Sequence, residues 1–142
     1  MEQAHLVTVL FKATKAVEEK IKNNISQYKL TITEFGVLEA LYSKGALFVQ
    51  ELCEKILVPN SSMTYTLDKL EKKGFIRRTK DVVDKRSFQI ILTNEGYFKT
   101  KEMLKKHYKF LDEILVNLTK KEKEVLRDLL KRIGKNELSI WK

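Results

Sequence analysis

The stretch that decides the fold runs from Asn60 to Gly74 and reads NSSMTYTLDKLEKKG. Its apolar positions are Met63, Leu67 and Leu70, which recur at the spacing of one face of an α-helix. We therefore expect that face to be buried. Asn60 or Ser61 would cap the start of this helix, and Gly74 would end it in the left-handed conformation. The polar positions fall largely on the other faces: Ser61, Ser62, Thr64, Tyr65, Asp68 and Lys69.

An exposed helix of this composition suits the major groove of DNA. Hydroxyl groups can bond phosphates or base edges, and lysines neutralise phosphate. The same pattern also fits an ordinary amphipathic surface helix, because hydroxyl-rich first turns are common. The neighbouring segments decide between these two interpretations.

The segment before Asn60 predicts two further helices. Thr31 and Glu34 have the spacing of a capping box, and the helix that they open ends near Gly45. Residues 46–48 allow a small strand. Apolar spacing predicts the next helix over residues 49–57, and Pro59 stops it. Two short helices joined by so tight a turn match a helix-turn-helix unit.

The segment after Gly74 predicts two strands, at residues 75–80 and 87–92, because both are rich in β-branched and aromatic residues. A hairpin after a helix-turn-helix is a wing. At its charged tip, Lys85 and Arg86 suit a minor groove, where negative potential attracts arginine. Asp84 would hold the Arg86 guanidinium through a charge-assisted hydrogen bond. A solvated charged turn remains the alternative for this loop alone.

Three long amphipathic helices flank this unit. The first spans residues 5–24, the second follows a cap at Thr93 and spans residues 94–118, and the third follows a capping box at Thr119–Glu122 and closes at Gly134. The apolar stripe of the second helix predicts these core positions: Tyr97, Leu104, Tyr108, Leu111, Leu115 and Leu118. These helices are too apolar to be solvated alone. The apolar face of the first helix could be covered either by a partner chain or by a large core within its own chain. We infer a symmetric homodimer.

Composition narrows the function classes. The net charge of +9 and pI near 9.5 favour an acidic partner, but the basic residues are spread along the chain. A single cysteine allows no internal disulfide, there is no apolar run of membrane-spanning length, and residues 1–3 show no signal pattern, so we expect a cytoplasmic protein. No nucleophile motif or glycine-rich phosphate loop is present, and neither His5 nor His107 lies at metal-ligand spacing. We expect His107, which lies on a lysine-rich helix, to be a surface or interface residue. We therefore predict no enzyme, no catalytic or metal site and no cofactor.

The chain resembles the MarR (multiple-antibiotic-resistance regulator) family of winged-helix transcription factors over essentially its whole length. The most specific part is the Asp84-Lys85-Arg86 wing followed by Leu92-Thr93-Asn94-Glu95-Gly96. The resemblance implies a mainly α fold with a small β wing, in which a winged helix-turn-helix is flanked by N- and C-terminal dimerisation helices. Residues 31–93 would form the DNA-binding domain, and residues 1–30 and 94–142 the helical dimerisation region.

The implied function is sequence-specific binding of double-stranded DNA, usually repression that a small ligand relieves. The helix at about residues 60–73 would enter the major groove and residues 81–87 the minor groove of a pseudo-palindromic operator. The predicted DNA-binding residues are Ser61, Ser62, Thr64, Tyr65, Lys69, Lys85 and Arg86, with Asp84 supporting the wing. Family clefts between the dimerisation helices and the winged domain often take aromatic or phenolic anions, which leaves room for such an effector.

Two departures from the family pattern matter. Tyr65 stands where relatives often carry an arginine that reads guanine, so we expect phosphate or thymine-methyl contacts and an A·T-rich operator. The peroxide-sensing branch has a cysteine near the start of its first helix, whereas Cys53 lies on the apolar side of a later helix, which indicates a structural thiol. Two other functions stay open: a winged-helix protein–protein interaction module, and a nonspecific architectural DNA binder.

Overall fold

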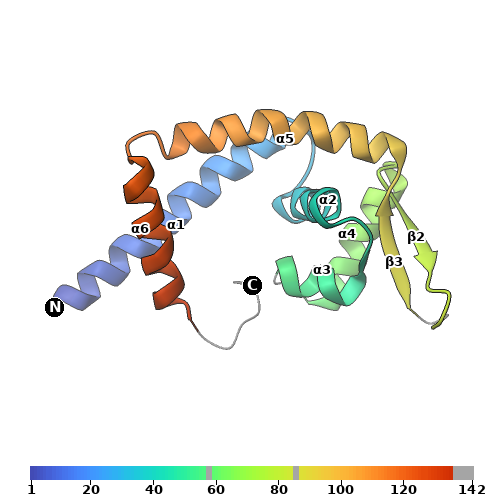
Figure 1. Cartoon of the computed structure of the whole chain (residues 1–142), viewed down its shortest axis with the longest axis horizontal. Helices are drawn as coiled ribbons and strands as arrows, with labels where there is room; N and C mark the ends of the chain where they lie inside the picture. Colours follow the sequence, from blue (N-terminus) through green and yellow to red (C-terminus); the bar gives the residue numbers. More distant parts are fainter. Residues whose placement is uncertain (57–58, 85–86, 136–142) are drawn as a thin grey trace.

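The computed structural model describes residues 1–56, 59–84 and 87–135. It is a mainly helical chain with one small sheet (Figure 1). The elements follow in the order α1 (Glu2–Ser26), α2 (Ile32–Lys44), β1 (Leu47–Phe48), α3 (Val49–Ile56), α4 (Asn60–Lys72), β2 (Ile76–Lys80), β3 (Phe88–Leu92), α5 (Asn94–Ile114) and α6 (Lys120–Ile133). The mainly α fold class with a β wing is confirmed.

Threonine caps begin three of the helices as the sequence predicts. The Thr31 hydroxyl accepts a hydrogen bond from the Glu34 amide, and the Glu34 carboxylate accepts one from the Thr31 amide. The same capping box forms between Thr119 and Glu122, and the Thr93 hydroxyl caps α5 alone. Each side chain occupies a backbone donor that the first helical turn leaves without a partner.

Three helices differ from the prediction at their ends. The first is longer than expected, because α1 runs from Glu2 to Ser26 rather than over residues 5–24. The expected side-chain cap of α4 is wrong: the helix begins at Asn60, and Pro59 stands at the cap position without a side-chain hydrogen bond. The long fifth helix ends at Ile114 rather than at Leu118, where a short turn leads to α6. The predicted left-handed end of α4 is confirmed, because Gly74 has a φ of 80°.

The sheet has three strands, in the order β1-β3-β2, and both pairings are antiparallel. The two-stranded wing of the sequence prediction is therefore incomplete. In the β1–β3 pairing, Leu47 of β1 lies opposite Ile90 of β3, which ties the start of the helix-turn-helix to the hairpin. This contact joins residues far apart in the chain, and two residues carry too little pattern to predict it.

The hydrophobic core lies inside the winged unit formed by α2, α3, α4 and the sheet. Val37 and Leu38 of α2, Leu52 of α3 and Leu70 of α4 are fully buried. The predicted inner face of α4 is confirmed by the burial of all three of its apolar positions. This packing fixes the direction of α4, so its opposite face points to solvent.

The buried face of α5 differs from the predicted stripe. Of the predicted positions only Leu104 is buried, and its buried neighbours are Gly96, Thr100, Met103 and His107. Tyr97 and Tyr108 stay about half exposed; Tyr97 stacks on Tyr42, with 5.0 Å between ring centres. The expectation that His107 lies at the surface is wrong, since the residue is only 6% exposed and packs on the ring of Phe35 at 4.7 Å.

The junction between the hairpin and α5 is close-packed. The Thr93 hydroxyl donates a hydrogen bond of 2.6 Å to the carbonyl of Gly74, and the Thr93 amide donates to the carbonyl of Phe75. A β-carbon at Gly96 would overlap that same Phe75 carbonyl. Only glycine fits here, which gives Gly96 of the wing signature a steric reason.

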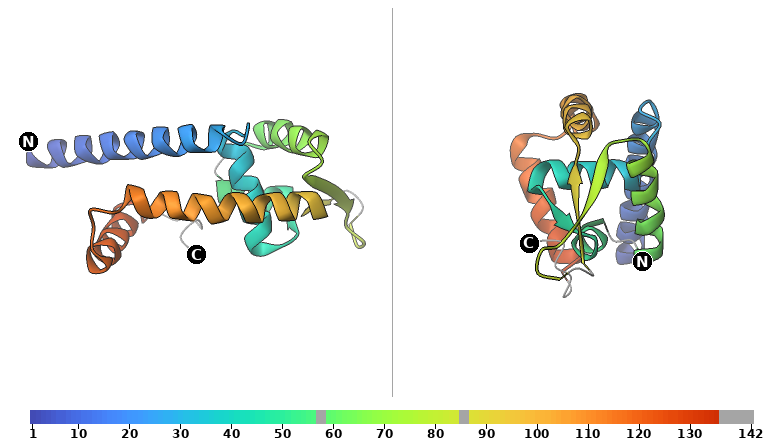
Figure 2. Two further views of the ribbon diagram at one scale, coloured as in Figure 1. Left: turned by 90° about the horizontal axis from the view of Figure 1, so that it is seen from above. Right: turned by 90° about the vertical axis from the view of Figure 1, so that its right-hand side faces the viewer.

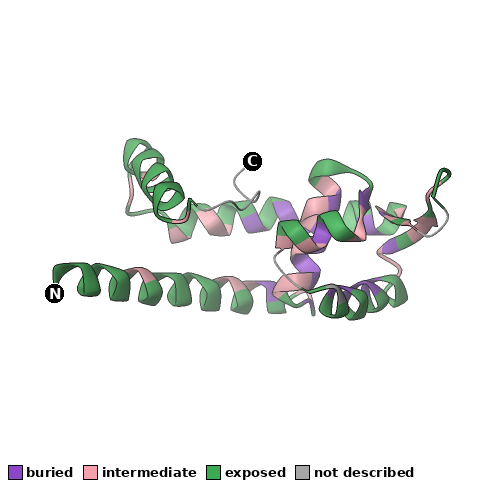
Figure 3. Ribbon diagram, turned by 90° about the horizontal axis from the view of Figure 1, so that it is seen from below, coloured by how far each residue is buried: buried purple, intermediate pink, exposed green. Residues whose placement is uncertain are grey.

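Two helical segments project away from the winged unit, and we call them the arms: residues 2–20 of α1, and α6 (Figure 2). Neither arm contains a buried residue, and Figure 3 shows exposed surface along both. Both arms nevertheless carry large apolar side chains, and these are exposed to solvent; Phe11, for example, is 69% exposed. No helix in residues 1–56, 59–84 and 87–135 is long and apolar enough to cross a membrane.

Candidate DNA-binding surface

The outer face of α4 carries the predicted contact residues. Ser61, Ser62, Thr64, Tyr65 and Lys69 are all exposed, and they share a helix whose opposite face is held in the core. The structure thus brings five of the seven predicted side chains together on one exposed surface. Hydroxyls, a phenol and an ammonium in a row are donors that can meet phosphates and base edges.

Tyr65 is the most prominent of these side chains. Tyr65 is a large residue that is 64% exposed, and the Lys69 ammonium lies 5.1 Å from the centre of its ring. A cation at this distance from an aromatic face is attracted by the negative face of the ring. The pair therefore presents a tyrosine hydroxyl and a positive charge side by side.

A hollow of about 440 Å³ lies between the start of α2 and the start of α4. Its lining is dominated by hydroxyls and ends at a lysine: Thr31, Thr33, Glu34, Ser61, Ser62, Tyr65, Thr66 and Lys69. The contribution from α2 was not predicted from the sequence. In the sequence, the only indication that α2 contributes hydroxyl groups was Thr33, which adds a second hydroxyl close to the Thr31 cap.

One partly buried ion pair links the end of α4 to the start of α2. The Lys73 ammonium donates to the Glu34 carboxylate at 3.0 Å and to the carbonyl of Lys29, also at 3.0 Å. Burial alone would raise the pKa of the Glu34 carboxyl, but the bonds from Lys73 and Thr31 outweigh it and hold that pKa below its usual value. Glu34 is thus a charged anchor beneath the exposed surface.

The wing loop is organised by two aspartates. The Asp81 side chain accepts a hydrogen bond from the Asp84 amide at 3.1 Å, and the Asp84 carboxylate accepts one from the Ser87 hydroxyl at 3.2 Å. Lys85 and Arg86 lie outside the described residues, so the expected contact from Asp84 to Arg86 stays a prediction. Val82 and Val83, between the two aspartates in the chain, are almost fully exposed, a feature that sequence analysis missed.

Arg78 is a second residue that sequence analysis missed. It projects from β2 and forms ion pairs with Asp68 and Glu71 on α4. The alternation of β2, which places Arg78 on the same side as the buried Ile76, could have indicated an inward-facing arginine. The partners could not be predicted, because they lie on another element.

Cys53 is half-buried against the hydrophobic core. Burial raises the pKa of its thiol, and the nearby Glu54 carboxylate adds to the effect, so the reactive thiolate is disfavoured. Burial also lowers the pKa of His107, against a smaller opposing effect of Glu39. Within the described part of the chain, no group of three or more histidine, cysteine or acidic side chains could hold a metal ion.

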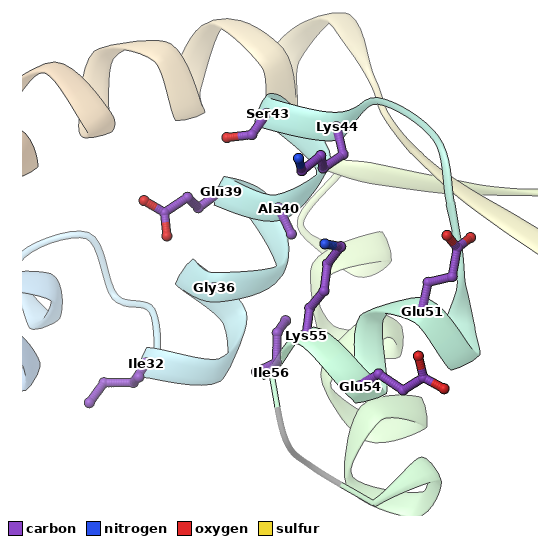
Figure 4. Close-up of a pocket in the computed structure, with 10 residues that line it drawn as sticks. All are labelled: Ile32, Gly36, Glu39, Ala40, Ser43, Lys44, Glu51, Glu54, Lys55 and Ile56. Atoms are coloured by element: carbon purple, nitrogen blue, oxygen red, sulfur yellow. The ribbon is translucent and has the colours of Figure 1, made fainter. Parts of the chain in front are cut away.

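A hollow of about 650 Å³ lies between α2 and α3 (Figure 4). Its lining combines the apolar side chains of Ile32, Ala40 and Ile56 with acids and lysines. A smaller hollow of about 430 Å³ lies between Tyr28, just after α1, and the first half of α5. None of the residues that line this smaller hollow belongs to the winged unit.

Comparison with known proteins identifies the family to which this chain belongs. The sequence model of the MarR family matches residues 30–88. The HTH-type transcriptional regulator MhqR of Bacillus subtilis (strain 168) is 34% identical over 131 residues, which cover 92% of this chain and 90% of that protein. The chain belongs to the MarR family. As a MarR-family protein it is a DNA-binding transcriptional regulator, and the sequence-based recognition is confirmed.

Solved MarR-family structures share the fold. A putative MarR-like regulator from Bacillus cereus ATCC 10987 superposes with a TM-score of 0.81 at 25% identity, covering 94% of this chain and 96% of that chain. A mutant MarR from E. coli complexed with operator DNA has a TM-score of 0.79 at 24% identity, covering 93% and 95%. The winged helix-turn-helix and both arms thus have counterparts in known structures.

Proposed function

We propose that this MarR-family protein represses transcription by binding one operator sequence, with α4 in the major groove and residues 81–87 in the minor groove. The observation that carries the proposal is the exposed row Ser61, Ser62, Thr64, Tyr65 and Lys69 on a helix whose inner face is locked in the core. Lys85 and Arg86 would add the minor-groove contact, and Asp84 would support the wing. A rigid helix with donors on its outer face is what direct readout requires.

The proposed operator is A·T-rich. Tyr65 is exposed at the centre of the row and, unlike arginine, cannot make the two-pronged hydrogen bond that selects guanine. Its ring suits thymine methyl groups and its hydroxyl suits phosphate. Selection from random duplexes by the wild type and by Tyr65→Ala tests this: a guanine-anchored site that the substitution leaves unchanged would contradict it.

The proposed active form is a homodimer. Residues 1–30 and 94–142 would form the dimerisation region and residues 31–93 the DNA-binding domain. The support is the arms, whose apolar side chains have no cover within the described residues although helices of this kind need one. A two-fold axis would place two copies of α4 over half-sites about one helical turn apart.

The proposed effector is a small aromatic or phenolic anion that releases the DNA. We place it in the hollow beside Tyr28, whose lining includes the apolar side chains of Phe98 and Met103. Lys99 and Lys106 in the same lining would pair with the anion, and the lining also contains Glu95 and Glu102. The Tyr28 hydroxyl is buried there without a hydrogen-bond partner among the described residues, and burial raises its pKa. Titration of the DNA complex with benzoate and with phenol tests the idea, which fails if neither releases DNA. Catalysis has no part in this proposal.

Fluorescence anisotropy tests DNA binding. Duplexes enriched by the wild type from a random library are compared with scrambled versions across a salt series. We expect Arg86→Gln to weaken binding of the enriched duplex about tenfold, because a groove contact is lost. Lys121→Gln, on α6, removes the same charge far from α4 and serves as the control.

The outcomes separate the alternatives. Preference for the enriched duplex, weakened by Arg86→Gln alone, supports a sequence-specific regulator. Equal, salt-sensitive binding of both duplexes indicates a nonspecific architectural binder instead. No binding of either duplex at low salt indicates a protein–protein interaction module and rejects the proposal.

A further inference from the structure

One arginine joins the wing to the outer face of α4. The Arg78 guanidinium donates a hydrogen bond from Nη2 to Asp68 Oδ1 at 2.7 Å and one from Nη1 to Glu71 Oε1 at 2.8 Å. The arginine side chain is 24% exposed, whereas the two carboxylate side chains are 54% and 43% exposed. Exposed ion pairs contribute little to stability, so the arrangement calls for a reason beyond folding.

The position of Arg78 follows from the strand. Side chains alternate along β2, so Arg78 shares its face with the buried Ile76, and it lies opposite Ile90 of β3 in the register. That face packs toward α4. Arg77 points the other way, is exposed, and makes no ion pair within the described part of the chain. The two neighbouring arginines therefore have the same charge but different surroundings.

The two acidic partners lie on the same stripe of α4 as two of the proposed DNA contacts. Ser61, Thr64, Asp68 and Glu71 follow one another at spacings of three and four residues, which places them on one stripe of α4. A helix that lays this stripe into a groove would bring both carboxylates toward DNA phosphates. Like charges brought together at an interface cost binding free energy.

We propose that Arg78 masks the charge of Asp68 and Glu71, so that the stripe of α4 can approach DNA. The inference rests on the proposed function, since it matters only if α4 enters a groove. Arg78 is a positioning residue: it acts through the two carboxylates and reaches them from the wing strand. Its fork of nitrogens spans both acids at once, which a single lysine ammonium cannot do in the same geometry.

The test compares purified full-length variants by fluorescence anisotropy, on the duplex that the wild type enriches and on its scrambled version. Relative to Arg77→Gln, which removes the same charge from the same strand, we expect Arg78→Gln to weaken binding of both duplexes about tenfold. The triple variant Arg78→Gln, Asp68→Asn, Glu71→Gln should return to within about threefold of Arg77→Gln, because no bare carboxylate remains. Thermal unfolding followed by circular dichroism establishes that each variant is folded.

A second variant keeps the test decisive if Arg78→Gln does not fold. Asp68→Asn with Glu71→Gln retains the arginine and should bind the scrambled duplex at least as tightly as the wild type, with a steeper salt dependence. Weaker binding would overturn the proposal. So would equal loss in Arg78→Gln and Arg77→Gln, or a triple variant as weak as Arg78→Gln. If the wild type enriches no duplex, the proposed function itself fails, and the masking role fails with it.

Discussion

The winged unit and the arms are built from the same kind of amphipathic helix, with opposite results. α4 buries its whole apolar face in the core of its own chain. α6 begins with a capping box, which α4 lacks, and carries a clear apolar stripe, yet it buries no residue. An amphipathic pattern therefore predicts that a face will be covered, but not by which chain.

The largest effect expected from this difference concerns the arms. Leu129→Ser with Ile133→Ser should weaken self-association by about 4 kcal/mol or more, because a symmetric dimer loses four apolar side chains from its interface. Sedimentation equilibrium measures the change. Arg127→Ser with Lys131→Ser has the same spacing on α6 and should leave association nearly unchanged. Equal association of the two variants would mean that α6 has no partner chain.

The next effect is inside the winged unit, where packing leaves no space. Gly96→Ala should lower the free energy of unfolding by about 3 kcal/mol, because its methyl group overlaps the Phe75 carbonyl and the backbone must shift. Urea unfolding measures this. Gly36→Ala is the matched control: its methyl group would meet Ile56 at an ordinary 3.7 Å, and alanine favours the helix. A stable Gly96→Ala would contradict the close junction.

A smaller effect is expected where the winged unit buries a charge. Lys73→Met should cost about 2 kcal/mol, because it leaves the buried Glu34 carboxylate without its main partner. Lys72→Met removes the same charge one residue earlier on the exposed side and should be nearly neutral in the same urea experiment. Equal stability of the two variants would show that α4 does not depend on the Glu34 anchor.

The smallest effect is a pH dependence at the boundary of the two regions. Burial holds the pKa of His107 below its ordinary 6.5, so the unfolded chain binds this proton first as the pH falls. Stability should therefore decrease as the pH drops below 6.5, down to the lowered pKa of the folded state. Urea unfolding at pH 7.5 and 5.5 measures the decrease, and His107→Phe should reduce it. An unchanged pH response in that variant would assign the effect to other groups.

Much of the site could be predicted because its signals are local. The Thr31, Thr93 and Thr119 caps, the left-handed Gly74 and the outer face of α4 each depend on residues within one or two helical turns. Hydrogen bonds between near neighbours and a 3.6-residue period are properties of the chain itself. The capping prediction at the start of α4 was wrong. There the run Asn60-Ser61-Ser62 offers several possible capping side chains in succession, so the local sequence does not single out one.

The rest depended on contacts between distant residues. Arg78 has ordinary neighbours in β2, and its ion pairs exist only because the hairpin packs on α4. The buried face of α5 includes Thr100 and His107 rather than the more apolar Tyr97 and Tyr108. The two tyrosines are wide and partly polar, so they can serve at an edge, while the position of α2 decides which side of α5 is enclosed.

The sequence by itself therefore determined the family, the order of the elements and the exposed row on α4, because each follows from local spacing and short motifs. The tertiary structure alone decided the β1–β3 pairing, the Glu34–Lys73 ion pair and the ion pairs of Arg78 with Asp68 and Glu71. Those depend on where elements far apart in the chain come to lie. That position is set by the packing of the whole core, which no single segment contains.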